Sequence, residues 1–513
     1  MVAAVAAVGL SPWWCLAAVP LILLGLLGAA DLLQRRHSML RNYPVLGHAR
    51  FLLERIRREL QQYFIERNFD GRPFDRDVRS IVYERAKGTD TEQPYGTERD
   101  VYQPGYEFLV PSMAPCPVPK TPPRVRVGGP DCSRPYDMAL LNVSAMSFGS
   151  LSANAILALN GGAAAGGFAH DTGEGGLSEY HLRPRGDLIW EVGTGYFGCR
   201  TRDGDFDAAE FADKAAHDHV KCVSLKLSQG AKSGIGGVLP GAKVNAEIAK
   251  VRDVPEGQTV ISPLYHKVFS TRRELVRFIA RMRELSGGKP TGFKLCVGSR
   301  RQFLAVCKAM LAEGTAPDFI VVDGGEGGIG AAPLEFADHV GTPLTEGLLT
   351  VHNALVGAGL RDRIRIGASG KIATGTDLVK RLLQGADYGN AARAMMFAVG
   401  CIQVQRCHTN TCLTGVTTQD PRRARALDVR DKTPRVQRFQ EATVASALQI
   451  MASMGVTDPA ELRPHMLRRR IAPHTECSYE ELYDWLEPSQ LLAEPPAAWA
   501  ADWQAADPDR FTV

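Results

Sequence analysis

The sequence predicts an α/β protein built on a (β/α)8 barrel of the TIM type, with an N-terminal transmembrane helix and helical extensions. Strand-like apolar runs alternate with helical patterns through the middle of the chain, which is typical of a parallel sheet. Glycine-rich polar segments follow most of these runs, as they do where the strands of a barrel end. A doubly wound sheet would show the same alternation, but the glycine-rich strand ends favour the barrel.

The first 30 residues form the most apolar part of the chain. Residues 2–30 carry no charged side chain, and about 20 such residues span a bilayer as a helix. Arginines follow from Arg35 onward, which under the positive-inside tendency places the rest of the chain in the cytoplasm. A buried core helix is the alternative. The sequence therefore predicts a single-pass membrane protein with a cytoplasmic catalytic domain.

The composition of the sequence changes at three points along the chain, so four segments are predicted. Residues 1–34 are the anchor, and residues 35–136 form a juxtamembrane helical and covering segment. Residues 137–430 form the barrel, and residues 431–513 form a helical tail. Within the barrel, Ser152 is expected to cap a helix. The expected strands lie at 139–146, 221–227, 292–297, 319–323 and 364–368. The expected helices lie at 152–165, 300–313, 345–358 and 374–384.

Composition and one weak motif exclude several classes of protein. The formal net charge is only +4 over 513 residues, which gives no reason to expect nucleic-acid binding. Eleven cysteines are too few in a chain of this length for a disulfide scaffold. Gly325, Gly327 and Gly330 match the dinucleotide fingerprint, which requires a helix to begin at once. Pro333 follows within three residues, so a Rossmann domain is not expected.

Three cysteines are clustered near the end of the predicted barrel. Cys401, Cys407 and Cys412 form a C-x5-C-x4-C arrangement, a spacing that indicates metal binding or reactivity. A structural zinc needs four ligands, and His408 is poorly placed because it directly follows Cys407. Three thiolates instead favour a three-iron cluster or an open iron site. Three unrelated core cysteines are the alternative.

Eight longer motifs occur along the middle of the chain. They are AMSFGSLS (145–152), TGEGG (172–176), KLSQGAKSGIGGVLPGAKVNAEIAKVR (226–252), ISPLYH (261–266), FKL (293–295), DGGEGGIGAAP (323–333), ASGKIATG (368–375) and GCIQVQRCHTNTCLTGVTTQD (400–420). These motifs resemble the FMN-binding central domain of glutamate synthase, and the chain is similar to the membrane-anchored FMN-binding glutamate synthase family. They occur in the order of that family and together cover about half of the chain.

The resemblance implies a barrel that binds FMN and a 3Fe–4S cluster, with reduced flavin converting 2-iminoglutarate, formed from 2-oxoglutarate and ammonia, into glutamate. It implies Lys232 and Arg252 as ligands of the 2-oxo acid carboxylates, and Glu174 near the arriving ammonia. The implied cluster ligands are Cys401, Cys407 and Cys412. The implied FMN-binding residues are Met146, Ser147, Gln229, Lys294, Glu326, Gly327, Gly328, Gly370, Asn390 and Ala391, with Lys294 also catalytic.

Some positions depart from the family pattern and leave the substrate open. A family glutamine and a family arginine of the substrate pocket are replaced by Val238 and Tyr196. An oxidoreductase for a different imine or amino acid, or an electron-transfer subunit without its own substrate, are therefore the alternatives to glutamate synthesis. No amidotransferase or NAD(P)H domain is recognised, so an electron donor protein is expected as a partner, besides a small 2-oxo acid or amino acid substrate and the membrane.

Overall fold

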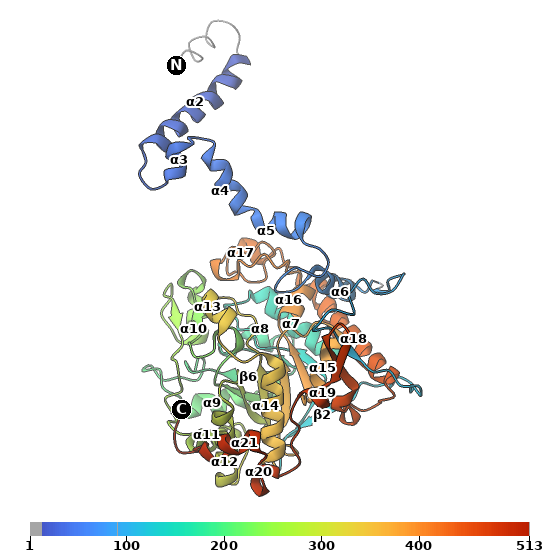
Figure 1. Ribbon diagram of the computed structural model, residues 1–513. Coiled ribbons are helices and arrows are strands. Elements are labelled where there is room, and N and C mark those ends of the chain that lie inside the picture. Colours follow the sequence, from blue (N-terminus) through green and yellow to red (C-terminus); the bar gives the residue numbers. More distant parts are fainter. Residues whose placement is uncertain (1–12, 90, 512–513) are drawn as a thin grey trace. The chain divides into compact units, whose positions relative to one another are not determined.

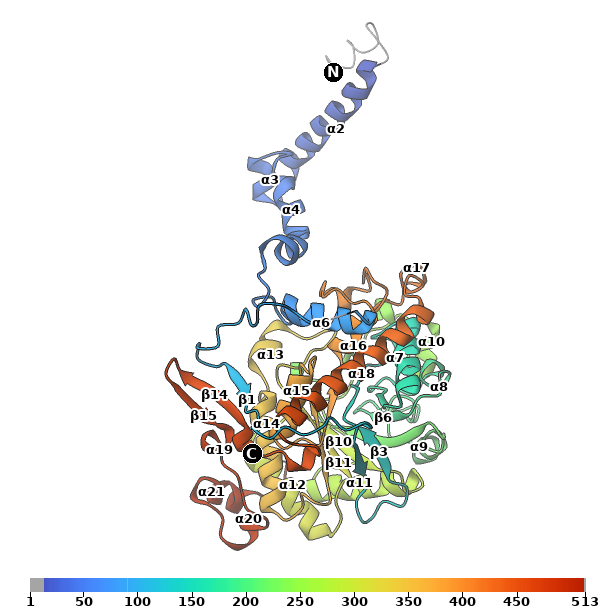
Figure 2. The same ribbon diagram turned by 90° about the vertical axis from the view of Figure 1, so that its right-hand side faces the viewer.

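Eight parallel strands close into a barrel in the computed structural model, which describes residues 13–89 and 91–511 (Figures 1 and 2). Each strand pairs with the next barrel strand along the chain, and the last, β13, pairs with the first, β4, to close the ring. The strands are β4 (Leu141–Val143), β5 (His170–Asp171), β6 (Leu188–Val192), β7 (Val220–Lys226), β10 (Thr291–Leu295), β11 (Phe319–Asp323), β12 (Arg365–Ser369) and β13 (Tyr388–Ala391). This ring confirms the predicted barrel.

Helices follow the barrel strands and cover the outside of the ring. Ser152 caps the first of them, as predicted, because its hydroxyl accepts the backbone N–H of Ala155. Thr271 and Thr374 begin two others with complete capping boxes. The helices of this part of the chain are α7 (Ala153–Gly166), α8 (Glu179–Leu182), α9 (Ala208–Ala215), α10 (Ala246–Arg252), α11 (Arg272–Leu285), α12 (Arg300–Glu313), α13 (Leu334–His339), α14 (Leu344–Gly357), α15 (Gly375–Leu383) and α16 (Arg393–Ala398).

The predicted strand at 139–146 is in fact divided between two sheets. Its first residue ends β3 (Tyr136–Ala139), which pairs with β2 (Arg124–Val127) in an antiparallel hairpin. The next residues form β4 of the barrel. Side chains of the hairpin pack against the inward-facing residues at the amino ends of the barrel strands, so the hairpin closes that end. This apolar cluster consists of Val127, Met138, Ala169, Ile189, Cys222, Phe319, Val321 and Tyr388.

Further elements surround the barrel. The long helix α18 (Val429–Ser453) packs along α7, and a small sheet joins β1 (Glu107–Leu109), β14 (Leu467–Ala472) and β15 (Thr475–Ser478). The C-terminal segment therefore contains strands as well as helices. The remaining elements are α6 (Arg76–Lys87), β8 (Val238–Leu239), β9 (Val260–Ile261), α17 (Pro421–Ala424), α19 (Tyr479–Leu482), α20 (Gln490–Ala493) and α21 (Ala497–Ala505).

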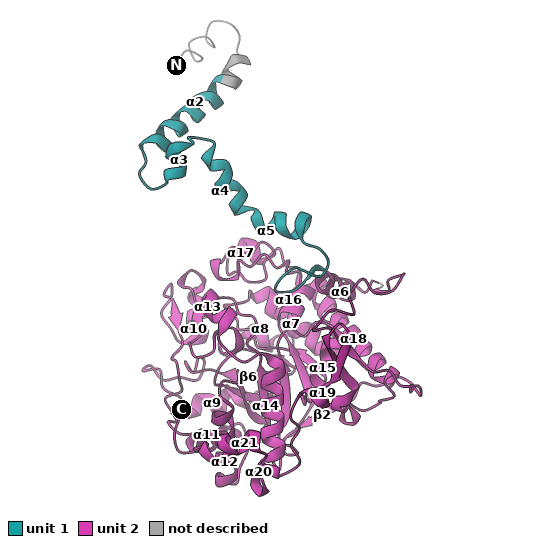
Figure 3. Cartoon of the chain, viewed as in Figure 1, with its two compact units in different colours: residues 1–76 teal, residues 77–513 magenta. Residues whose placement is uncertain are grey.

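The chain divides into two compact units, residues 1–76 and residues 77–513 (Figure 3). The barrel and its extensions lie in the second unit. The described part of the first unit is helical. It contains α2 (Trp13–Leu33), α3 (Ser38–Asn42), α4 (Gly47–Arg55), α5 (Arg57–Leu60) and a π-helical turn (Gln61–Ile65).

The predicted single-pass membrane anchor over residues 1–34, with its cytoplasmic catalytic domain, is corrected by the structure. Within the described residues, no helix has both the length and the apolar character needed to cross a bilayer. The start of the predicted anchor, residues 1–12, lies outside the described residues. Near the end of α2, the Asp31 carboxylate accepts the backbone N–H of Val45 at 2.9 Å and contacts Nε2 of His48 at 2.9 Å.

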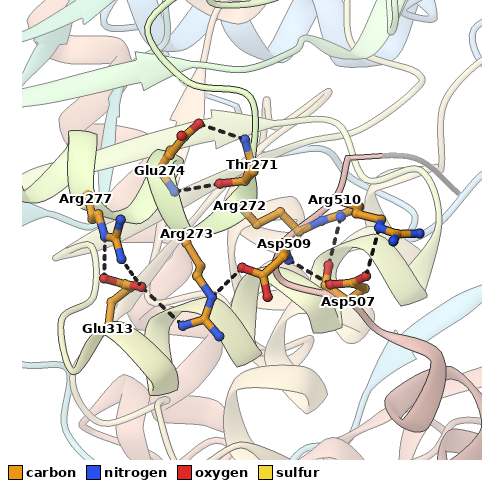
Figure 4. Close-up of polar contacts among 9 residues, drawn as sticks. All are labelled: Thr271, Arg272, Arg273, Glu274, Arg277, Glu313, Asp507, Asp509 and Arg510. Carbon is orange, nitrogen blue, oxygen red and sulfur yellow. Dashed lines mark hydrogen bonds and ion pairs between the residues drawn. The ribbon is translucent and has the colours of Figure 1, made fainter.

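The C-terminal residues are held against α11 and α12 by a network of ion pairs (Figure 4). The guanidinium of Arg273 contacts Asp509 at 2.6 Å and also Glu313, whose carboxylate pairs with Arg277 at 2.6 Å. Arg272 donates to the backbone carbonyl of Asp507. Exposed pairs of this kind contribute little to stability. Their main effect is to fix where the tail lies.

Buried histidines predict an acid-sensitive fold, and His170 on β5 is the clearest test. Burial lowers its pKa to about 3, its side chain is fully buried, and neither ring nitrogen has a hydrogen-bond partner among the described residues. Below about pH 6.5, the ordinary pKa of histidine, this side chain binds a proton in the unfolded chain but not in the folded chain. The free energy of unfolding should therefore fall as the pH drops from neutrality toward 4, with a slope of about 1.4 kcal/mol per pH unit from this residue.

His170→Leu should remove that part of the slope and, because it deletes two unpaired polar atoms, should not destabilise the protein at pH 7. Urea unfolding between pH 4.5 and 7.5 measures both effects. The exposed His339→Gln serves as the control and should leave the slope unchanged. Parallel stability profiles for His170→Leu and the unchanged protein would contradict this account.

Candidate active site

A buried ion pair joins β6 and β10 inside the carboxyl end of the barrel. Lys294 near the end of β10 contacts the carboxylate of Glu191 on β6, and the two residues are only 5% and 1% exposed. Burial lowers the pKa of the Lys294 ammonium, but the carboxylates of Glu191, Asp171 and Asp323 outweigh it and raise the pKa overall. Lys294 therefore carries a positive charge at neutral pH.

A second carboxylate lies beside this pair. Asp171 at the end of β5 is 1% exposed and accepts the backbone N–H of Gly173 at 3.0 Å. Burial and the neighbouring Glu191 raise the pKa of Asp171, which disfavours its charged form. The interior thus changes from apolar near the hairpin to strongly polar at the carboxyl end.

A second ion pair lies next to the first, because Lys226 on β7 is paired in register with Lys294 on β10. The ammonium of Lys226 contacts Glu174 at 2.9 Å. Burial raises the pKa of Glu174, but Lys226, Arg252 and Lys294 outweigh it and lower the pKa overall. Glu174, in the predicted TGEGG loop, is therefore an ionised carboxylate surrounded by cations.

Lys232 and Arg252 bring two further cations to Glu174. The Lys232 side chain is 1% exposed, and its ammonium has no hydrogen-bond partner among the described residues. Burial, with a smaller effect from Lys226, lowers its pKa to about 8. Arg252 is 4% exposed and donates to the Ser147 hydroxyl at 3.1 Å and to the Phe148 carbonyl at 3.0 Å. Burial lowers its pKa to about 10. Buried cations with unused donors are suited to hold an anion.

Most of the predicted FMN-binding residues lie on the loops that follow β4, β7, β11 and β12, whereas Asn390 and Ala391 end β13 and Lys294 lies in β10. Two of them have buried polar atoms without a partner in the described part of the chain: Nε2 of Gln229 and Oδ1 of Asn390. The loops approach each other so closely that a Cβ at position 230 would overlap the carbonyl oxygen of Gly324. Only glycine fits there. These unpaired atoms and the close backbone approach are compatible with a flat bound group.

Other predicted FMN residues already have partners within the chain. The carboxylate of Glu326 accepts the backbone N–H of Leu344 at 2.9 Å and so caps α14. A Cβ at Gly328 would meet the guanidinium of Arg393, which also donates to the Glu326 carbonyl at 3.1 Å. Gly370 has a φ of +153°. Together with Gly327, Met146, Ser147 and Ala391, these residues lie at the same end of the barrel; their roles toward a cofactor stay predictions.

Cys401, Cys407 and Cys412 lie on the loop between α16 and α17, close enough for each thiol to affect the pKa of another. Burial raises the pKa of Cys401 to about 12. Burial also raises that of Cys412, but contacts with Thr417 and Thr414 lower it overall. In the described part of the chain, no three His, Cys, Asp or Glu side chains are placed to hold a single metal ion. A cluster binds each thiolate to a different iron and so needs a wider spacing.

Sequence reasoning missed Glu191, Asp171, Lys226 and Lys243. Lys226 and Lys243 both lie within the long lysine- and glycine-rich motif, which signals their importance without showing their partners. Lys243 is 3% exposed, donates to the Ser150 carbonyl at 3.0 Å and lies near Cys407 and Cys412. Burial lowers its pKa to about 8. It therefore connects the cysteine loop to the loop that carries Ser147.

The Lys294–Glu191 pair predicts a specific pattern of stability. Lys294→Met leaves a buried carboxylate without its cation and should destabilise the barrel by about 3–5 kcal/mol. Lys294→Met combined with Glu191→Leu should recover most of this loss, because apolar replacement of both partners is often close to neutral. Urea unfolding of the two variants measures the coupling. If the double variant is less stable than Lys294→Met alone, the pair does not govern the stability of this end of the barrel.

A family model and two similar sequences point to the same protein family. The model of the conserved region in glutamate synthase matches residues 136–457. The glutamate synthase large subunit-like protein YerD of Bacillus subtilis is 37% identical over 495 residues, which cover 88% of this chain and 94% of that protein. An archaeal glutamate synthase (NADPH) of Methanocaldococcus jannaschii is 34% identical over 330 residues, 64% of this chain and 61% of that protein.

Among solved structures, a flavocytochrome b2 variant with pyruvate bound aligns over 92% of this chain and 97% of its own, at 14% identity and a TM-score of 0.42. That likeness is too distant to bear on function. The family match covers more than half of the chain and includes every barrel strand. The chain therefore belongs to the glutamate synthase family and is a glutamate synthase-like enzyme.

Proposed function

We propose that the carboxyl end of the barrel binds FMN and a 2-oxo acid, and that the enzyme reduces 2-iminoglutarate, formed from 2-oxoglutarate and ammonia, to glutamate. The observation that carries this proposal is the buried ammonium of Lys232, which has no partner among the described residues and lies close to Glu174. The names of the relatives, which are glutamate synthases, support the same reaction.

The cations around Glu174 suit a substrate with two carboxylates. Lys232 offers an ammonium with three free donors, and Arg252 offers a guanidinium whose Nε has no acceptor among the described residues. The Ser147 hydroxyl and the Phe148 carbonyl fix the orientation of that guanidinium. A bound dianion would supply the negative charge that these two buried groups lack. This arrangement favours a small dicarboxylate over a neutral substrate.

FMN, when bound, would supply the hydride that reduces the imine. The residues that we assign to it are Met146, Ser147, Gln229, Lys294, Gly327, Gly328, Gly370, Asn390 and Ala391. Gln229 and Asn390 offer unpaired polar atoms for hydrogen bonds, and Lys294 offers a cation that stabilises negative charge near it. Glu326, whose carboxylate caps α14, contributes mainly by fixing the loop.

Glu174 can attract and hold the nitrogen donor. Its carboxylate is ionised, and one oxygen lies 3.5 Å from the Ser262 hydroxyl while the other contacts Lys226. A Cβ at Gly193 would lie 2.6 Å from the same carboxylate, so glycine leaves room for it. Ammonia next to this oxygen could donate a hydrogen bond to the carboxylate, which would hold and orient it.

The three-cysteine loop is proposed to hold a 3Fe–4S cluster that passes electrons from a separate donor protein. Cys401, Cys407 and Cys412 provide three thiols on one loop, and Lys243 places a buried cation beside two of them. A cation favours the thiolate form that iron requires. The loop contacts the active-site segment directly, because Gln419 donates to the carbonyls of Gly149 and Leu151 at 3.0 and 2.7 Å.

A different imine or amino acid is the second candidate substrate, and two positions favour it. Tyr196, which replaces the family arginine, is fully buried, and its hydroxyl lies 3.1 Å from Nδ1 of His266. That ring in turn contacts the Lys226 carbonyl at 2.9 Å through Nε2. The Tyr196 hydroxyl therefore already has a hydrogen-bond partner within the protein. Val238, 38% exposed, offers no polar group to a substrate.

Substitution of Lys232 tests the role of the unpaired ammonium. Lys232→Gln should raise the KM for 2-oxoglutarate at least tenfold, because a charge-assisted bond to a carboxylate contributes about 1.5–3 kcal/mol. The assay measures glutamate formed from 2-oxoglutarate and ammonia with dithionite as reductant. Lys221→Gln, on the outer surface of β7, is the matched control. No glutamate from the unchanged protein would exclude 2-oxoglutarate, and activity on another 2-oxo acid would then support the second candidate.

Substitution of one cysteine tests the proposed cluster. Cys407→Ser should lower the iron content of anaerobically purified protein by more than half, because a serine hydroxyl is a poor ligand for an iron–sulfur cluster. Flavin content should stay the same. Cys477→Ser, on β15, is the control and should retain all iron. Equal iron in both variants, or none in the unchanged protein, would refute the cluster.

A further inference from the structure

A second charged cleft lies outside the proposed active site. It has a volume of about 520 Å³ and is formed by the loop after β6, helix α9 and the end of helix α10. Both helices lie on the same side of the barrel in two perpendicular views (Figures 1 and 2). Sites for small ligands usually have volumes of about 300–1,000 Å³. Three cations line this cleft: Arg200, Arg202 and Lys250.

These three cations lack a close anionic partner in the described part of the chain, although Asp253 lies near enough to Arg200 to interact with its charge. In the described part of the chain, none of them forms an ion pair or a side-chain hydrogen bond. Nε of Arg200 is also buried without a partner. The guanidinium of Arg200 lies 5.7 Å from the centre of the Phe197 ring, which restricts its position. A buried donor without an acceptor is an independent indication that a ligand completes the site.

The acidic residues of the cleft do not cancel this positive charge. Glu210 is already paired with Lys214 at 2.7 Å. Asp253 directly follows α10 with a φ of +52°, and burial together with Glu210 raises its pKa. Counting Asp253 as fully ionised still leaves an excess of two positive charges from Arg200, Arg202 and Lys250.

We propose that this cleft binds a small anion with at least two negative charges, such as a phosphate or polycarboxylate compound. Guanidinium groups recognise such anions through paired hydrogen bonds. The cleft is separate from the active site, although Phe197 is shared: Arg252, whose guanidinium lies 5.2 Å from the same ring, is buried and hydrogen-bonded to the Ser147 loop. The proposal does not depend on the proposed reaction.

Calorimetric titration of the full-length protein at low ionic strength tests the site, with pyrophosphate and citrate as the probes. One equivalent of at least one probe should bind. Arg200→Gln should weaken that binding about tenfold or more, as expected for loss of a charge-assisted bond. Asp253→Asn should strengthen it, because it removes a competing charge and asparagine tolerates the left-handed conformation. A gain in affinity cannot result from misfolding.

Arg183→Gln is the matched control. Its guanidinium also lies over an aromatic ring, 5.4 Å from the centre of Tyr180, but it is paired with Glu179 and lies away from the cleft. It should bind both probes as the unchanged protein does. Tighter binding of pyrophosphate or of citrate would identify the class of anion. Absence of binding by both probes, or equal affinity in Arg200→Gln and the unchanged protein, would overturn the proposal.

Discussion

Two lysines stand side by side at the carboxyl end of the barrel, and the site depends on how their charges are balanced. Lys226 and Lys294 are paired in register on β7 and β10. Two buried ammonium groups at this separation repel each other, so each needs its own carboxylate. Glu174 supplies one and Glu191 the other. These two carboxylates come from neighbouring parts of the ring, and together the four residues form the charged centre around which the other site residues are arranged.

The barrel tolerates this charge because its interior has two levels. At the amino end, the hairpin of β2 and β3 closes an apolar cluster that includes Phe319 and Tyr388. This packing supplies stability without polar partners. The carboxyl end can then hold Lys232 and Arg252, whose burial is unfavourable until an anion arrives. Barrel enzymes place their reactive groups at this same end.

The fold and the site differed in how far the sequence could predict them. The alternation of strands with helices and the glycine-rich loops were sufficient to predict the barrel. The motifs pointed to Lys232, Arg252 and Glu174, which the structure places near one another. The partner of Lys294 could not be predicted, because Glu191 lies about 100 residues earlier and is brought close only because β6 and β10 both pair with β7 in the sheet. The membrane anchor was wrong, because no helix among the described residues has the length and apolar character that a membrane span requires.

The most direct test of the central claim is to titrate 2-oxoglutarate into anaerobically purified protein while recording the flavin absorbance spectrum. The account predicts one flavin per chain and a saturable change in its spectrum, because the acid binds beside the flavin to the cations around Glu174. A protein with a full complement of flavin whose spectrum does not respond to 2-oxoglutarate or any other small 2-oxo acid would contradict it. Protein that binds no flavin at all would contradict it as well.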